Sequence, residues 1–257
     1  MTKPTVIETR KLTKTYNADA APVTALADIS FAAEEGSFVS LVGPSGCGKS
    51  TLLQILAGLI ASSSGEVLVD GVPVRKPMPD KIAVIFQDAT LLPWKTVIQN
   101  VTFPLEIQKV PERERHERAQ AMLVLVGLAD FAARHPHELS GGMRQRVSIA
   151  RGLAQNPRII LMDEPFGALD EQTRLKMGNE LLRIWTKTNK TIFLITHSLT
   201  EALFLSDVVL VMSQRPGRII ADVAIPFERP RGLEIGDTPE FNAICSQLRG
   251  KIQQMAH

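Results

Sequence analysis

The segment GPSGCGKS, residues 43–50, constrains the fold of this chain more than any other feature. A short apolar run, residues 38–42, precedes it, and the apolar spacing of residues 52–59 predicts one buried face of a helix after it. Glycines allow successive backbone N–H groups to turn inward around a phosphate, and the N-terminus of the following helix adds a favourable dipole. The sequence therefore predicts a strand, a phosphate-binding loop and a helix, in that order. A merely flexible glycine loop is the weaker interpretation, because flexibility alone does not require a preceding strand and a following helix.

Side chains of the predicted loop, and a second motif, carry the expected chemistry. Lys49 is predicted to reach the β and γ phosphates of a nucleotide, and the Ser50 hydroxyl can ligate Mg²⁺. Asp163 and Glu164 follow the apolar run 159–162 and supply carboxylates at a strand end. Asp163 would hold Mg²⁺ through water, whereas Glu164 points elsewhere along the pleat and can serve as general base toward an attacking water. Solvated acids at a strand end are the alternative, but together with the phosphate loop the pair predicts a nucleotide hydrolase.

The stretch between these two motifs indicates which kind of hydrolase this is. Residues 139–146 read LSGGMRQR, and they resemble the LSGGQ signature of the ABC ATPase family. Met143 stands where the family usually has glutamine, a difference that we expect to matter little. The Ser140 hydroxyl and the N–H groups of Gly141 and Gly142, at the start of a helix, are what make an anion site. Ser140 is equally well placed to cap that helix, and both interpretations describe one geometry.

The resemblance to ABC ATPases implies roles for further residues. Tyr16 matches the aromatic residue that stacks on adenine, with an ordinary strand-end aromatic as the alternative. Gln87 matches the glutamine that senses Mg²⁺ and the γ phosphate, and His197 matches the histidine that touches the γ phosphate. Asp170, in the segment 167–170, matches a loop that crosses to a second subunit. The family further implies a sandwich dimer, in which each ATP lies between the phosphate loop of one chain and the signature of the other.

The predicted site thus has three groups of residues. The predicted catalytic residues are Lys49, Gln87, Glu164 and His197. The predicted Mg²⁺ ligands are Ser50, Gln87 and Asp163. The predicted ATP contacts are Tyr16, Gly43, Pro44, Ser45, Gly46, Cys47, Gly48, Lys49, Ser50, Thr51, Ser140, Gly141, Gly142 and Asp170.

Strands alternate with helices on either side of a helical stretch, which predicts an α/β fold. We expect a P-loop NTPase core with a mainly parallel sheet, an N-terminal antiparallel β subdomain and a helical insert. Residues 1–257 are predicted to form one ABC ATPase domain, with the helical subdomain at about residues 99–154. Strands are predicted at residues 6–12, 27–33, 38–42, 66–69, 82–86, 159–162, 192–195 and 208–212.

Composition excludes several other classes of protein. Lysine and arginine number 29 against 27 aspartate and glutamate residues, so the nearly balanced surface does not predict nucleic-acid binding. Cys47 and Cys245 lie far apart, which argues against a disulfide framework or a zinc site and suits a reducing cytosol. We expect no signal peptide at the first residues, and the chain has no run of about 18 apolar residues. We therefore expect a protein on the cytoplasmic face of the cell membrane, with any membrane role exerted through a partner.

Three segments suggest the kind of ABC system. Residues 88–94 (DATLLPW), 201–207 (EALFLSD) and 212–219 (MSQRPGRI) are similar to the importer ATPases of the nitrate, sulfonate, taurine and pyrimidine-precursor group. This similarity implies a second ATP-binding subunit, an integral-membrane permease and a solute-binding protein as partners. Leu91, Leu92 and Trp94 are candidates for the permease contact, with packing beneath the helical insert as the alternative. An ABC exporter would share the catalytic residues and stays open, whereas a non-transport ABC ATPase would show a coiled-coil insertion or zinc cysteines.

Overall fold

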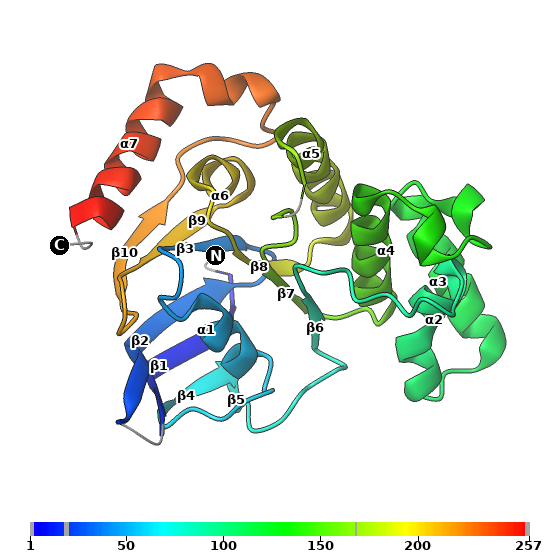
Figure 1. Cartoon of the computed structure of the whole chain (residues 1–257), viewed down its shortest axis with the longest axis horizontal. Helices are drawn as coiled ribbons and strands as arrows, with labels where there is room; N and C mark the ends of the chain where they lie inside the picture. The colour runs from blue at the N-terminus through cyan, green and yellow to red at the C-terminus, as the bar shows by residue number, and fades with distance from the viewer. Residues whose placement is uncertain (1–2, 18–20, 168, 255–257) are drawn as a thin grey trace. The chain divides into compact units, whose positions relative to one another are not determined.

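The computed structural model describes residues 3–17, 21–167 and 169–254. Its backbone divides into two compact units, one built from residues 1–78 with residues 191–257, the other from residues 79–190. Figure 1 labels the elements of both units. In the described part of the chain, no helix has the length and apolar character needed to cross a membrane.

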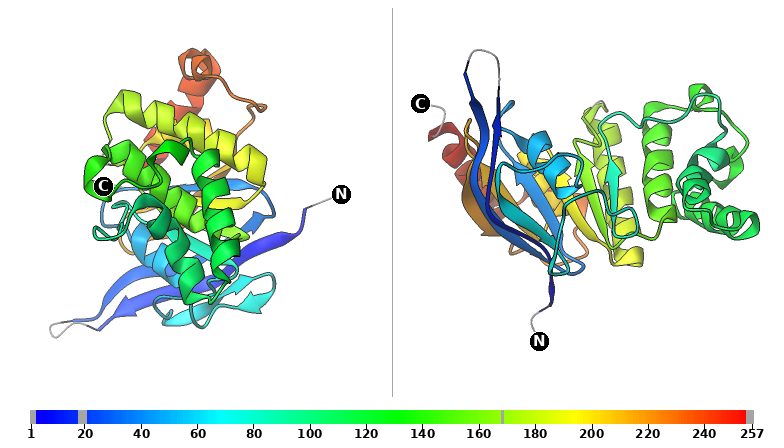
Figure 2. Two further views of the ribbon diagram at one scale, coloured as in Figure 1. Left: turned by 90° about the vertical axis from the view of Figure 1, so that its right-hand side faces the viewer. Right: turned by 90° about the horizontal axis from the view of Figure 1, so that it is seen from below.

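The first unit begins with an antiparallel sheet of strand order β2-β1-β4-β5. Its strands are β1 (Thr5–Tyr16), β2 (Val23–Glu34), β4 (Ser64–Val69) and β5 (Val72–Pro73). The two long strands β1 and β2 curve side by side in both views of Figure 2. Burial alternates along β2, as expected for a sheet with one face on the core. At Gly65 a Cβ atom would lie 2.3 Å from the Lys11 carbonyl oxygen, so only glycine lets β4 approach β1 there.

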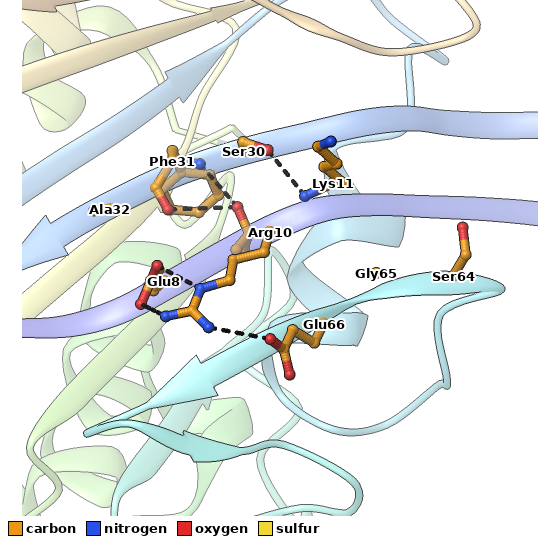
Figure 3. A pocket seen from close by; sticks show the side chains of 10 residues that line it. Glu8, Arg10, Lys11, Ser30, Phe31, Ala32, Ser64, Gly65 and Glu66 are labelled. Carbon is orange, nitrogen blue, oxygen red and sulfur yellow. Dashed lines mark hydrogen bonds and ion pairs between the residues drawn. The ribbon is translucent and has the colours of Figure 1, made fainter.

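The solvent side of this sheet carries a hollow with paired charges. Arg10 on β1 contacts Glu8 on its own strand and Glu66 on β4, at 2.7 and 3.3 Å (Figure 3). These side chains are substantially exposed, so the pairs contribute little to stability. The hollow contains none of the residues predicted to bind a nucleotide.

The first unit also contains the strand that leads into the phosphate loop. The strand β3 (Phe38–Val42) lies between β8 (Thr191–Ile195) and β9 (Val208–Met212) and pairs with both in parallel. The strand β10 (Ile219–Ala224) pairs antiparallel with β9. All five residues of β3 and all five of β8 are buried, which is typical of parallel strands covered on both faces. The helices of this unit are α1 (Lys49–Leu56), α6 (Leu199–Leu205) and α7 (Pro239–Gln254), with the 3₁₀ turn η3 (Leu233–Asp237).

The second unit is a parallel strand pair interrupted by helices. The strand β6 (Ile82–Ile85) pairs with β7 (Ile159–Asp163), and α4 packs against β6. The helices α2, α3 and α4 pack against one another. The elements of this unit after β6 are α2 (Val97–Ile107), α3 (Glu112–Leu125), η1 (Ala129–Phe131), η2 (Pro136–Glu138), α4 (Gly141–Ala154), β7 and α5 (Glu171–Thr188).

The predicted strands are all present, and their bounds differ mainly in length. The strands at 6–12 and 27–33 are longer, because β1 and β2 continue as a paired ribbon beyond their regular alternation. The strands β4 and β5 form a hairpin, and its two turn residues Asp70 and Gly71 have φ of 51° and 73°. The strand β10 and the helix α7 were not predicted. The predicted α/β fold class is confirmed, while the division into a single domain with an insert at about 99–154 stays a prediction.

A buried arginine holds the C-terminal part of the first unit together. Arg231 is only 6% exposed, and its guanidinium donates hydrogen bonds to the carbonyls of Leu203, Phe204 and Ser206, at the end of α6. It also donates to the Phe227 carbonyl. Burial lowers the pKa of Arg231 to about 10, which still leaves the group charged at neutral pH. A cation at a helix C-terminus satisfies carbonyls that have no partner within the helix.

We expect Arg231→Met to lower the free energy of unfolding by about 2–4 kcal/mol, because it leaves several buried carbonyls unpaired. Urea denaturation measures the change. The matched control is Arg113→Met on α3, whose side chain is 92% exposed and pairs with Glu117. The control should stay within about 0.5 kcal/mol of the parent. Equal effects of the two substitutions would contradict the buried-cap interpretation.

Candidate functional site

The loop between β3 and α1 has the conformation that the glycine motif predicts. Gly46 and Gly48 have φ of 73° and 107°, in the left-handed region that favours glycine. At Gly48, the residue before the first turn of α1, a Cβ atom would lie 2.8 Å from the Leu26 Cδ2 atom. A Cβ atom at Gly43 would lie 2.9 Å from the Met212 carbonyl oxygen. The loop is therefore held closely between β2 and the end of β9.

Lys49 opens α1 and folds back over the loop. Its side chain is largely buried, and the ammonium donates to the carbonyls of Gly43 and Pro44 at 2.9 and 3.0 Å. A positive charge is thus fixed at the mouth of a loop whose helix begins with unpaired backbone N–H groups. Among the charged groups of a nucleotide, phosphate is the one that this arrangement fits. Cys47 fills space inside the loop, where burial raises the pKa of its thiol and keeps it protonated.

Tyr16 lies beside the same helix at the end of β1. Its ring is 41% exposed, and its hydroxyl oxygen lies 3.4 Å from the Thr51 hydroxyl in the first turn of α1. The Lys14 ammonium lies 5.0 Å from the ring centroid. A strand-end aromatic used only for packing would be buried, whereas this ring leaves apolar surface accessible next to the phosphate loop.

His197 is exposed immediately after β8, and the residues around it are fixed by hydrogen bonds. The Thr196 hydroxyl donates to the Glu201 carboxylate and accepts from the Ser198 backbone N–H. The Ser198 hydroxyl caps α6 by accepting from the Glu201 N–H. The imidazole is therefore presented from a rigid turn.

The second unit contains the other predicted residues, and some of them line a cavity. A cavity of about 150 Å³ is lined by Gln87 and Asp88 after β6, by Gly141 and Arg144 of α4, and by Pro165 after β7. At Gly167 a Cβ atom would lie 3.1 Å from the Gln87 Nε2 atom. The segment after Glu164 therefore passes directly beside the Gln87 side chain.

Asp163 and Glu164 differ in backbone conformation although they are neighbours. Asp163 is the last residue of β7, whereas Glu164 has φ of 43°, a value that residues other than glycine rarely adopt. The Glu164 carbonyl accepts from the Gly167 N–H at 3.0 Å and so closes a tight turn. Such strained conformations gather at functional sites, because the surrounding structure must hold them. Ala168, in the segment 167–170, lies outside the described residues.

Two helix starts complete the predicted set. The Ser140 hydroxyl caps α4 by accepting from the Met143 N–H at 3.3 Å, with Gly141 and Gly142 as the first helical residues. Met143 therefore contributes its backbone to the cap, so its difference from the family's glutamine leaves this geometry intact. The Asp170 carboxylate caps α5 by accepting from the Thr173 N–H at 3.0 Å, a bond that lowers its pKa.

Mg²⁺ typically takes oxygen ligands from phosphate and water with one or two from protein. Ser50 on α1 and Asp163 at the end of β7 are oxygen donors of the required kind. Across the described ranges, no three His, Cys, Asp or Glu side chains gather as a metal site.

Sequence reasoning missed two arginines that support these motifs. Arg151 donates to the carbonyls of Ala89 and Thr90 and so holds the segment after Gln87. Arg215 donates to the Gly46 carbonyl inside the phosphate loop. Each arginine bonds to a backbone carbonyl more than 60 residues away, and no spacing in the sequence signals such a bond.

Comparisons with known proteins agree with this geometry. A family model described as ABC transporter matches residues 26–167. The taurine import ATP-binding protein TauB of Rhizobium johnstonii is 52% identical over 237 residues, which cover 91% of this chain and 90% of that protein. A dimeric structure of the ATP-binding cassette MJ0796, in a post-hydrolysis state bound to ADP and Pi, has a TM-score of 0.75 and 33% identity, and covers 86% of this chain and 100% of its own. The cbiO1 protein of Clostridium perfringens, part of the ABC transporter complex cbiONQ, has a TM-score of 0.78 and 25% identity, and covers 99% of this chain and 100% of its own.

The fold, the phosphate loop and these similarities define an ATPase with a P-loop core. Within that class, this chain belongs to the ABC transporter family, as an ATP-binding protein. The resemblance inferred from the phosphate loop and the LSGGM segment is thereby confirmed. The roles of individual residues remain predictions.

We expect Lys49→Ala to reduce ATP hydrolysis by about 10²-fold or more, because the charge held over the phosphate loop is lost. Phosphate release and isothermal titration with ATP measure the effect. Lys187→Ala, which removes an exposed charge in the last turn of α5, is the control and should behave as the parent. Unchanged turnover in Lys49→Ala would show that this loop is not the hydrolytic site.

Proposed function

We propose that this chain is the ATP-hydrolysing subunit of an ABC importer of the nitrate, sulfonate and taurine type. It works as a dimer at the cytoplasmic face of the membrane, against a separate permease, with a solute-binding protein in the complete system. The similarity to a taurine import protein over 91% of the chain supports import rather than export. The membership of cbiO1 in a transporter complex supports a partner of this kind.

The observation that carries the proposal is the presence of two anion-binding helix starts in one chain. One is α1, which begins behind the phosphate loop and Lys49, and the other is α4, which begins behind Ser140. Each presents backbone N–H groups and a helix dipole to a negative charge. A nucleotide between two chains would use α1 of one and α4 of the other. The dimeric MJ0796 structure with ADP and Pi supports this arrangement.

In this proposal each side chain has a definite task. Lys49 and the loop N–H groups bind the phosphates, Tyr16 stacks on adenine, and Asp170 lies near the partner chain. Ser50, Gln87 and Asp163 are the residues that would hold Mg²⁺, which when bound would neutralise charge on the phosphates.

The remaining tasks concern the proton and the γ phosphate. The Glu164 carboxylate takes the proton of the attacking water. His197 orients the γ phosphate. Because the site needs both chains, separation of the dimer after hydrolysis is the motion available to a permease.

We expect Glu164→Gln to keep ATP binding but slow hydrolysis by about 10²- to 10⁴-fold, since the amide keeps the shape and loses the base. The unreacted nucleotide should then hold two chains together. Size-exclusion chromatography with ATP and Mg²⁺ measures the dimer, which should weaken when ADP replaces ATP.

The matched control for this experiment is the double variant Glu164→Gln with Ser140→Ala. It keeps the slow chemistry but loses the α4 cap, so it should stay monomeric with ATP. Hydrolysis at the parent rate in Glu164→Gln would refute the assignment of the base. An equally stable dimer in the double variant would refute the role of Ser140 across the interface.

The permease contact is proposed at Leu91, Leu92 and Trp94. Trp94 is 72% exposed, so its ring is not used to pack this chain. Asn100, which is fully buried, fixes the turn beneath it by accepting from the Leu92 N–H at 2.7 Å and donating to the carbonyls of Leu92 and Lys95. An exposed aromatic ring on a rigid support is typical of a residue that dominates a protein interface.

We expect Trp94→Gln to weaken binding of the permease by about tenfold or more, with the ATPase rate and melting temperature of the isolated subunit unchanged. Copurification with the permease in detergent measures binding, and uptake of solute into vesicles measures transport. Ile107→Gln, at another exposed apolar position in the same unit, is the control. A collapsed melting transition in Trp94→Gln would favour packing over docking. Equal loss with Ile107→Gln would show that any exposed apolar residue has the effect.

A further inference from the structure

The loop at residues 213–218, which joins β9 to β10, packs against the phosphate loop. Ser213 makes the 213–218 loop rigid, because its hydroxyl donates to the carbonyls of Gln214 and Pro216 and accepts from the Arg218 N–H. The Ser213 N–H also donates to the Arg218 carbonyl at 2.9 Å. The loop is thus a closed turn rather than a loose connection.

Gly217 fastens this turn to the strand β2 on one side and to the phosphate loop on the other. Its N–H donates to the Ala25 carbonyl at 2.9 Å, and its carbonyl accepts from the Ala27 N–H at 3.0 Å. A Cβ atom at Gly217 would lie 2.3 Å from the Cys47 carbonyl oxygen. The close approach to the phosphate loop therefore requires glycine at this position.

Arg215 makes the polar contact between the two loops. Its Nη2 atom donates to the Gly46 carbonyl at 3.0 Å. Gly46 has φ of 73°, in the left-handed region that favours glycine. The Arg215 charge also acts on Cys47, where it lowers the thiol pKa against the larger upward effect of burial.

The geometry of the peptide bond gives this contact a consequence for the phosphate site. The Gly46 carbonyl and the Cys47 N–H belong to one planar trans amide, so they point in opposite directions. An arginine that holds the carbonyl on the outside of the loop therefore directs the N–H toward the inside. A hydrogen bond from a charged donor also polarises the amide and strengthens its N–H as a donor.

We propose that Arg215 is a positioning residue for the nucleotide: it acts through the Gly46 carbonyl to hold the Cys47 N–H toward the bound phosphates. This inference rests on the proposed function of the loop as the ATP site. It gives the segment RPG at residues 215–217 a task in the reaction cycle, beyond its use as a mark of the importer group. The phosphates that a P-loop backbone cradles are present in both ATP and ADP. The contribution of Arg215 is therefore the same for both nucleotides.

The test is Arg215→Ala in the full chain, with binding of ATP and ADP measured by isothermal titration. Both affinities should fall by about three- to tenfold, the effect of losing one charge-assisted hydrogen bond that is partly open to water. KM for ATP should rise by the same factor, with kcat at saturating ATP within about twofold of the parent. Arg215→Lys keeps a charged donor and should recover most of the affinity.

Arg218→Ala is the matched control, since it removes the same charge from an exposed position in the same loop. It should bind both nucleotides as the parent does. Equal losses in the two alanine variants would overturn the inference in favour of a general electrostatic effect. A loss confined to ATP would also overturn it, because Arg215 would then contact the γ phosphate directly.

Two results separate this inference from the proposed function. If the parent binds both nucleotides and Arg215→Ala binds them equally well, the positioning role is wrong and the ATP site stands. If the parent binds neither nucleotide, the proposed function fails and the inference fails with it. A lower melting temperature with unchanged affinities would reduce Arg215 to a structural role.

Discussion

The parallel pairing of β3 with β8 on one side and β9 on the other supports the rest of the first unit. Parallel neighbours cannot be joined by a tight turn, so the strand that carries the phosphate loop is held by residues about 150 or more positions further along the chain. Polar contacts reinforce the arrangement where the strands meet α6. The Asp207 carboxylate accepts from the Phe38 N–H, and the hydroxyls of Ser40 and Ser206 lie within hydrogen-bonding distance in the buried interior.

The loop that follows β3 is costly to form without its neighbours. Its backbone places Gly46 and Gly48 at positive φ, and several of its carbonyls need partners from outside regular secondary structure. Those carbonyls are satisfied by cations: Lys49 holds Gly43 and Pro44, and Arg215 holds Gly46. The same positive charges favour an anion inside the loop, so the groups that stabilise the loop also favour phosphate binding.

In the second unit, helix caps and a residue at positive φ hold the segments of the predicted site. Ser140 and Asp170 fix the starts of α4 and α5, while Glu164 keeps a left-handed conformation after β7. Arg151 and Asn100 organise the segments after Gln87 and around Trp94 from inside the helical packing. Hydrogen bonds from Arg151 and Asn100 thus hold the segments that carry Gln87 and Trp94.

The sequence alone determined the elements whose signals are local. The glycine spacing at 43–48, the apolar strands before Lys49 and Asp163, and the serine before α4 each act within a few residues, and the structure contains the corresponding loop, strands and cap. Tertiary structure alone decided the exposure of Trp94, the buried arginine at the end of α6, and the bond from Arg215 to Gly46. The physical reason is that a backbone carbonyl carries no residue identity. Which arginine it meets depends on the order of the strands, which a local pattern does not contain.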